Sequence, residues 1–176
     1  MDRLTPANRI NSISTIKGQF RLRSGQTSNE YFDKYLFESQ PDLLRAIAEQ
    51  MATQIPKNID ALAGLELGGV PIATVISQLT GLPTLFVRKS AKEYGTCRLV
   101  EGGDVSGRRL VIIEDVITSG GQVIESAQEL RKLNGTISDV LCVIDRESGG
   151  TANLQQHGLR LQALFTASEL KTSPAK

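Results

Sequence analysis

Residues 110–122 read LVIIEDVITSGGQ, where two adjacent carboxylates separate an aliphatic run from a Thr-Ser-Gly-Gly loop. Glycines let a backbone approach an anion closely, and a loop that leads into a helix presents unpaired backbone N–H groups. Thr118 and Ser119 add hydroxyl donors. The stretch is therefore typical of a phosphate-binding loop, although it matches neither the Walker motif GxxxxGK[ST] nor the dinucleotide motif GxGxxG.

The two carboxylates, Glu114 and Asp115, need a partner other than the phosphate, because like charges repel. Ribose hydroxyls donate hydrogen bonds and suit an acceptor-only carboxylate, and Mg²⁺ also favours oxygen ligands. A ligand with a sugar diol and a 5′-phosphate would use both parts of the stretch. Solvated acids at a strand end, followed by an ordinary helix, are the simpler interpretation of the same residues.

The surrounding elements alternate between strand and helix. Apolar runs predict strands over 60–66, 82–89, 110–114 and 139–145, and helical spacing predicts helices over 41–54, 71–79 and 121–135. Gly81 and Gly135 are predicted to end the last two helices. Residues 19–37 predict two short strands around a hairpin-like loop, and residues 90–107 a long polar loop. This order predicts an α/β fold with a parallel sheet covered on both faces and ligands at the carboxyl ends of its strands.

Composition limits the function classes. The chain has 176 residues, of which 40% are hydrophobic and 22% charged, which predicts one folded domain. A net charge of +1 gives no support to a nucleic-acid or membrane role, and we expect neither partner. Cys97 and Cys142 make no disulfide framework, so we expect a reducing cytoplasm, with Cys142 in the core. The single histidine, His157, excludes a multi-histidine metal site and lies in a predicted surface turn.

The stretch 110–122 closely resembles the 5-phosphoribosyl 1-diphosphate (PRPP) signature of type I phosphoribosyltransferases. That signature is an apolar strand, two acids, two spacers, and then Thr, one of Ser, Thr or Ala, and Gly. Three further stretches resemble the orotate phosphoribosyltransferase family. FRLRSGQTSNEYFD (20–33) is similar to its hood segment, RKSAKEYGTCRLVEG (88–102) to its mobile loop, and IDRESGG (144–150) to its strand end of the type D-R-x-x-G-G. All occur in the family order and together span most of residues 20–150.

The resemblance implies a type I phosphoribosyltransferase fold. This is a central, mostly parallel sheet flanked by helices, with a small N-terminal hood over about 18–40 and a core over about 41–165 of a single domain, 1–176. It implies a glycosyltransferase that moves the phosphoribosyl group from PRPP to orotate and gives orotidine 5′-monophosphate and diphosphate. Mg²⁺ would arrive on PRPP, near Asp115, without dedicated protein ligands. The enzyme would be a homodimer whose mobile loop reaches the neighbouring active site.

The resemblance also assigns roles to residues. Lys92, Asp115 and Glu114 would be catalytic. The residues expected to bind PRPP are Arg23, Leu67, Gly68, Gly69, Arg88, Lys89, Lys92, Tyr94, Glu114, Asp115, Val116, Ile117, Thr118, Ser119, Gly120, Gly121 and Gln122. Those expected to bind orotate are Tyr31, Phe32, Thr118 and Arg146, the arginine offering a bidentate fork to the orotate carboxylate.

Three positions depart from the family pattern. Many members carry Lys where this chain has Arg23, His where it has Tyr94, and Lys where it has Gly68. The segment 67–70 would then act through backbone N–H groups alone. Two alternative functions stay open: an enzyme of the same fold that uses another base, and a regulator that binds PRPP or a nucleotide without catalysis. Arg146 and the hood segment oppose the first, and the lack of a recognisable DNA-binding element opposes the second.

Overall fold

A six-stranded sheet forms the centre of the computed structural model, which describes residues 4–21, 25–90 and 99–172. Its strand order is β5-β4-β3-β6-β7-β8, and every neighbouring pair is parallel except β4 and β5. The strands are β3 (Ala61–Leu65), β4 (Thr84–Val87), β5 (Val100–Glu101), β6 (Arg109–Ile117), β7 (Thr136–Asp145) and β8 (Arg160–Thr166). The predicted α/β fold with a mostly parallel sheet is confirmed.

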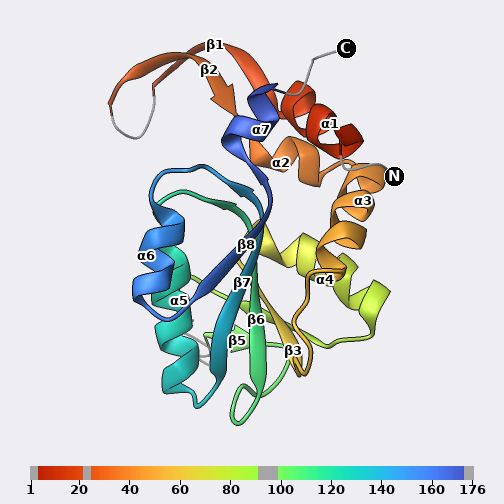
Figure 1. Cartoon of the computed structure of the whole chain (residues 1–176), viewed down its shortest axis with the longest axis vertical. Coiled ribbons are helices and arrows are strands. Elements are labelled where there is room, and N and C mark those ends of the chain that lie inside the picture. Colours follow the sequence, from red (N-terminus) through yellow and green to blue (C-terminus); the bar gives the residue numbers. More distant parts are fainter. Residues whose placement is uncertain (1–3, 22–24, 91–98, 173–176) are drawn as a thin grey trace.

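Helices cover both faces of this sheet (Figure 1). One face packs against α3 (Pro41–Ala52) and α4 (Gly69–Thr80), and the other against α5 (Gly121–Lys132) and α6 (Gly150–Gln156). Alternation along the strands produces the two cores, since Val111 and Ile113 of β6 belong to the first and Ile112 to the second. Cys142 lies fully buried in the second core, as predicted.

The N-terminal segment and the C-terminal helix meet at the same end of the molecule (Figure 1). This region contains α1 (Leu4–Ser14), the antiparallel hairpin of β1 (Thr15–Arg21) and β2 (Thr27–Phe32), α2 (Lys34–Glu38) and α7 (Ala167–Thr172). We call it the hood. The predicted hairpin is confirmed, but residues 34–38 form a helix because Asp33 caps it and accepts a hydrogen bond from the Tyr35 backbone at 3.0 Å.

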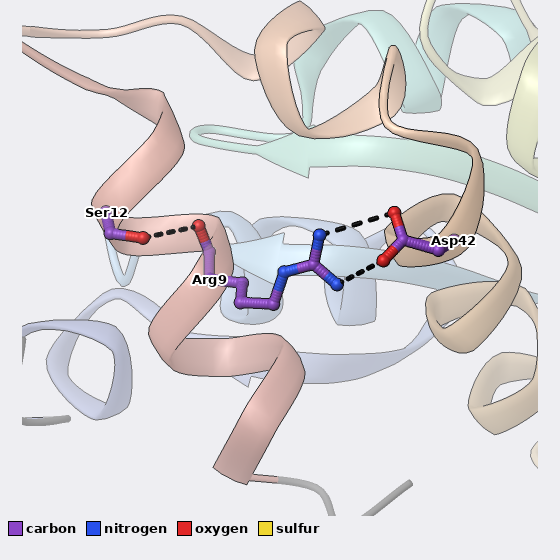
Figure 2. Close-up of polar contacts among 3 residues, drawn as sticks. All are labelled: Arg9, Ser12 and Asp42. Atoms are coloured by element: carbon purple, nitrogen blue, oxygen red, sulfur yellow. Dashed lines mark hydrogen bonds and ion pairs between the residues drawn. The ribbon is translucent and has the colours of Figure 1, made fainter. Parts of the chain in front are cut away.

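A surface ion pair connects α1 of the hood to α3 of the core. Figure 2 shows Arg9 reaching Asp42 through both of its terminal nitrogens, at 2.6 and 3.3 Å. Asp42 lies in the first turn of α3, where a carboxylate is also favoured by the helix dipole. The hydrogen bond from Arg9 holds the pKa of Asp42 below its ordinary value. Because both groups are exposed, we expect the pair to fix orientation more than it adds stability.

Two predicted helix ends have different outcomes. Gly81 ends α4 in the left-handed conformation with φ 77°, as predicted. At the end of α5, however, Asn134 and not Gly135 adopts the positive φ of 63°. Gly135 is required for space, because a Cβ there would lie 2.7 Å from Val105 Cγ1 and 3.0 Å from the Leu130 carbonyl. None of the helices in the described ranges has the length and apolar character that crossing a membrane requires.

Candidate active site

Four loops follow the carboxyl ends of β4, β3, β6 and β7, which lie at the same end of the sheet because these strands are neighbours and run parallel. The register aligns the last residues of β3 and β4, Leu65 and Val87, and those of β6 and β7, Ile117 and Asp145. Since Gly64 aligns with Ile113, β6 and β7 extend beyond the ends of β3 and β4. The loops that follow contain residues 66–68, 88–89, 118–120 and 146–149. The sequence predicted ligand-binding loops after these strands, and the topology places them together.

The predicted phosphate loop connects β6 to α5. Gly120 precedes the helix with φ 76°, and the N–H groups of the first turn of α5 have no partner within their own helix. Helix α6 supports the loop from behind, since Asn153 Nδ2 donates to the Ser119 carbonyl at 2.8 Å. Gly150 contributes by lacking a side chain, because a Cβ there would overlap the Thr118 carbonyl. Asn153 and Gly150 were not predicted, as nothing local in the sequence links them to this loop.

The backbone of the loop between β3 and α4 packs directly against β6, with no room for a side chain between them. A Cβ on Gly68 would overlap the Asp115 carboxylate, and one on Gly69 would overlap the Ile113 carbonyl. Gly68 thus leaves room for Asp115, which gives the departure at this position a structural reason. The Glu66–Leu67 peptide bond is cis, and Leu67 is 62% exposed.

Part of the predicted cationic cluster follows β4. Lys89 is exposed, and its backbone N–H donates to Glu66 Oε1 at 2.8 Å, which joins this loop to the preceding one. Arg88 is half-buried, with its Nε 3.6 Å from Glu101 Oε1. Three further residues that are expected to bind PRPP lie outside the described residues: Arg23, Lys92 and Tyr94.

The two acids lie within β6 and are buried, because the strand continues to Ile117 and does not end at 114 as predicted. Glu114 is 8% exposed and Asp115 is fully buried. Glu114 Oε1 accepts the Asp115 backbone N–H at 3.0 Å. Helix α2 covers Asp115, since Lys34 Nζ lies 2.6 Å from Asp115 Oδ2 and Glu38 of the same helix is also buried. Sequence reasoning missed Lys34 and Glu38, although their i,i+4 spacing behind the Asp33 cap was a usable signal.

Burial shifts the ionisation of this cluster. Burial raises the pKa of Glu114 well above its ordinary value, and the hydrogen bond and charge of Asp115 raise it further. Burial would also raise the pKa of Asp115, but its interaction with Glu114 and its ion pair with Lys34 outweigh burial, so the net pKa is lowered. Burial lowers the pKa of Lys34, but its ion pair with Asp115 outweighs this, so the net pKa is raised. The site therefore favours a charged Asp115 beside a charged Lys34.

A cavity of about 330 Å³ lies between the hood hairpin and the phosphate loop. It is lined by the four residues predicted for orotate, Tyr31, Phe32, Thr118 and Arg146, together with Ser28, Glu30, Lys34 and Val116. A larger cavity of about 620 Å³ adjoins it, shares Ser28, Glu30, Tyr31, Phe32 and Arg146 with it, and extends to α1 and α7. We take the smaller cavity as the candidate substrate pocket because it is lined by Val116 of β6 and Thr118 of the phosphate loop, whereas the larger cavity is not.

Arg146 is placed by the turn that follows β7. Asp145 accepts the Glu147 backbone N–H and the Thr151 hydroxyl, both at 2.9 Å, and the Arg146 backbone N–H donates to the Ile117 carbonyl at 2.8 Å. The Arg146 guanidinium lies 5.5 Å from the centre of the Phe32 ring, in cation–π contact. The side chain is exposed, so its charge is available to a ligand in the pocket. His157 ends α6 and contacts the Asn153 carbonyl at 2.8 Å, away from this pocket.

Comparison with known proteins agrees with this site. The phosphoribosyl transferase domain matches residues 37–156 of the chain. An orotate phosphoribosyltransferase from a Nocardioides species is 52% identical over 166 residues, which are 94% of this chain and 93% of the relative.

Solved structures give the same result. A Mycobacterium tuberculosis orotate phosphoribosyltransferase in complex with Fe(III) dicitrate has a TM-score of 0.87 and 28% identity, covering 97% of this chain and 99% of the other. The same enzyme in complex with PRPP has a TM-score of 0.83 and 25% identity, at 97% and 99% coverage. The chain therefore belongs to the phosphoribosyl transferase domain family and, within it, to the orotate phosphoribosyltransferases.

Proposed function

We infer that the chain transfers the 5-phosphoribosyl group from PRPP to orotate, giving orotidine 5′-monophosphate and diphosphate in pyrimidine biosynthesis. The observation that carries this inference is the 330 Å³ pocket, which is lined by both Arg146 and the phosphate loop. Arg146 lies in cation–π contact with Phe32, and the loop follows the buried acids Glu114 and Asp115. A planar carboxylated base fits the first part, and a phosphorylated sugar fits the second.

We assign each loop at the carboxyl ends of the strands to one part of the substrates. Residues 116–122 would hold the 5′-phosphate through backbone N–H groups and the hydroxyls of Thr118 and Ser119. Glu114 and Asp115 would accept hydrogen bonds from the ribose hydroxyls. The backbone at 67–69 would bind the diphosphate, because its glycines approach so closely. Arg146, Thr118 and the rings of Tyr31 and Phe32 would surround orotate.

The reaction needs no nucleophilic side chain. The bond from the anomeric carbon to diphosphate breaks, and positive charge develops on the ribose. The orotate ring nitrogen bonds to the same carbon from the opposite face and gives up its proton. Asp115, held charged beside Lys34, would stabilise that positive charge while it orients the hydroxyls. Arg88, Lys89 and Lys92 would stabilise the leaving diphosphate, and closure of the segment 90–107 would exclude water.

Mg²⁺ is proposed to enter with PRPP and to neutralise charge on the departing diphosphate. Within the described residues, no group of three or more His, Cys, Asp or Glu side chains is arranged to hold a metal. The ammonium of Lys34 also lies against Asp115. Protein ligands are therefore a poor fit for a resident ion, and the substrate oxygens are the better ligands.

The assembly and location remain proposals. We propose that the whole chain acts as one phosphoribosyltransferase domain and pairs into a homodimer whose 90–107 segment serves the neighbouring site. A location in the reducing cytoplasm stays a prediction from the cysteine content.

One assay separates this function from the two alternatives. Purified protein is incubated with PRPP, Mg²⁺ and orotate, uracil, adenine or hypoxanthine, and nucleotide and diphosphate are measured. We expect product with orotate alone. Product with a purine would identify an enzyme for another base, and PRPP binding without turnover on any base would indicate a regulator.

A further inference from the structure

Helix α2 places two ionisable side chains, Lys34 and Glu38, against Asp115. They are four residues apart and therefore lie on one face of the helix. Lys34 Nζ lies 2.6 Å from Asp115 Oδ2, and Glu38 is only 8% exposed. The proposed reaction gives no role to Glu38, yet a carboxylic acid is seldom buried without a partner.

The charges of the buried cluster do not balance if every acid is ionised. Glu38, Glu114 and Asp115 are three carboxyls, and Lys34 supplies one ammonium. Because an unpaired buried charge is strongly unfavourable, two of the three carboxyls should keep their protons. Burial, a hydrogen bond with Asp115 and the charge of Asp115 raise the pKa of Glu38 to about 9.

Two unsatisfied oxygens indicate where the proton of Glu38 lies. Glu38 Oε1 and Asp115 Oδ2 are both buried, and neither accepts a hydrogen bond from the described part of the chain. Lys34 reaches Asp115 Oδ2 at ion-pair distance without hydrogen-bond geometry. A protonated carboxyl is a donor as well as an acceptor, so one proton between Glu38 and Asp115 satisfies both oxygens.

We propose that Glu38 is a positioning residue for the active-site acid: it keeps its proton, uses it to donate a hydrogen bond to Asp115 and so fixes that carboxylate before PRPP binds. Gly68 lies against the same carboxylate and provides the space for it. The proposal rests on the proposed role of Asp115 in holding ribose. The proposed hydrogen bond also connects the hood to the reaction, because its donor, Glu38, lies on α2 and its acceptor, Asp115, lies on β6.

Kinetics of two variants test the positioning role. Glu38→Gln keeps the shape and an N–H donor, so its KM for PRPP should stay close to wild type. Glu38→Ala loses the donor, and its KM for PRPP should rise by about tenfold or more, since a hydrogen bond to a charged group is involved. The KM for orotate should change much less in both. Equal defects in both variants, or an unchanged Glu38→Ala, would overturn the proposal.

Stability against pH tests the proton without any assay of activity. The folded pKa of Glu38, about 9, lies above the ordinary value of 4.5, so the folded state binds more protons than the unfolded state between these values. The stabilising contribution of the protonated form is therefore complete below pH 4.5 and is lost as pH rises toward 9. Glu38→Gln has no proton to lose, so its melting temperature should rise relative to wild type across this window.

The control is Glu125→Gln, an exposed carboxylate on α5, whose melting temperature should follow wild type at every pH. The charged groups that act on Glu38 are Asp33, Lys34 and Asp115, and Glu114 interacts with the last two. All of them are present in both Glu38→Gln and wild type. A constant difference between Glu38→Gln and wild type from pH 5 to 9 would refute the shared proton. A pH-dependent difference in a protein that fails to transfer phosphoribose to orotate would instead refute the proposed function alone.

Discussion

A first prediction concerns Arg146, whose backbone is fixed by a hydrogen bond to Ile117 while its side chain is exposed to a ligand. We predict that Arg146→Ala raises the KM for orotate roughly 10- to 100-fold, as a lost hydrogen bond to a charged group is worth about 1.5–3 kcal/mol. The exposure of the side chain argues against the larger loss of a fully buried pair. Steady-state kinetics with each substrate varied in turn would measure the change.

The matched control for this variant is Arg45→Ala, which removes an arginine whose side chain is 68% exposed on α3 and paired with Glu49. It should leave both Michaelis constants unchanged. If Arg146→Ala altered the KM for PRPP and not that for orotate, the arginine would belong to the donor site.

The acid pair is the second residue-scale case. We predict that Asp115→Asn combined with Glu114→Gln lowers kcat/KM by about 100-fold or more, because preorganised charge near the ribose is lost. Both replacements keep the shape of the side chain, so circular dichroism and gel filtration should show a folded protein. Glu125→Gln is the matched control on the surface. Wild-type turnover by the double variant would remove the acids from the mechanism.

At the scale of elements, α2 links the hood to the sheet through one partly buried ion pair. Removing one partner of a fully buried pair costs about 3–5 kcal/mol, but the Lys34 side chain is 33% exposed, so solvent screening reduces that figure. We predict that Lys34→Met lowers the free energy of unfolding by about 1–3 kcal/mol, measured by urea denaturation.

Lys132→Met provides the comparison, since that lysine side chain is 70% exposed and pairs with Glu129 on the surface of α5. Its effect should lie within about 1 kcal/mol of zero. Similar losses in the two variants would mean that the Lys34–Asp115 pair contributes no more than a surface contact.

At the scale of the whole molecule, the prediction concerns two subunits. If Lys92 serves the neighbouring site of a homodimer, a mixed dimer of Lys92→Ala and Asp115→Asn subunits carries both lesions in one site and leaves the other intact. Random exchange makes about half of the dimers mixed, so roughly a quarter of wild-type activity should return. Co-expression with two different tags, followed by tandem purification, would establish that subunits exchanged. No recovery in verified mixed dimers would place Lys92 in its own subunit's site.

Sequence patterns failed to predict several elements of the hood and both outer strands of the sheet, β5 and β8. The sequence did not predict α1, α2, β5, α6, β8 or α7. Two-residue β5 and seven-residue α6 are too short to show a period, and β8 lies at the edge of the sheet with a mixed burial pattern. The end of β6 was placed three residues early, because charges at 114 and 115 break the apolar pattern although the backbone still pairs as far as Ile117.

The alternation of strands and helices, and with it the parallel sheet, could be predicted from the sequence. The loop chemistry after β6 and β7 could be predicted as well, because strand, glycine-rich turn and helix start are encoded by consecutive residues. Three contacts became visible only in the folded chain: α2 covers Asp115, Gly68 makes room for it, and Asn153 supports the phosphate loop. Each of these contacts joins segments at least 34 residues apart. They depend on how β4, β3, β6 and β7 line up in space, which no local pattern specifies.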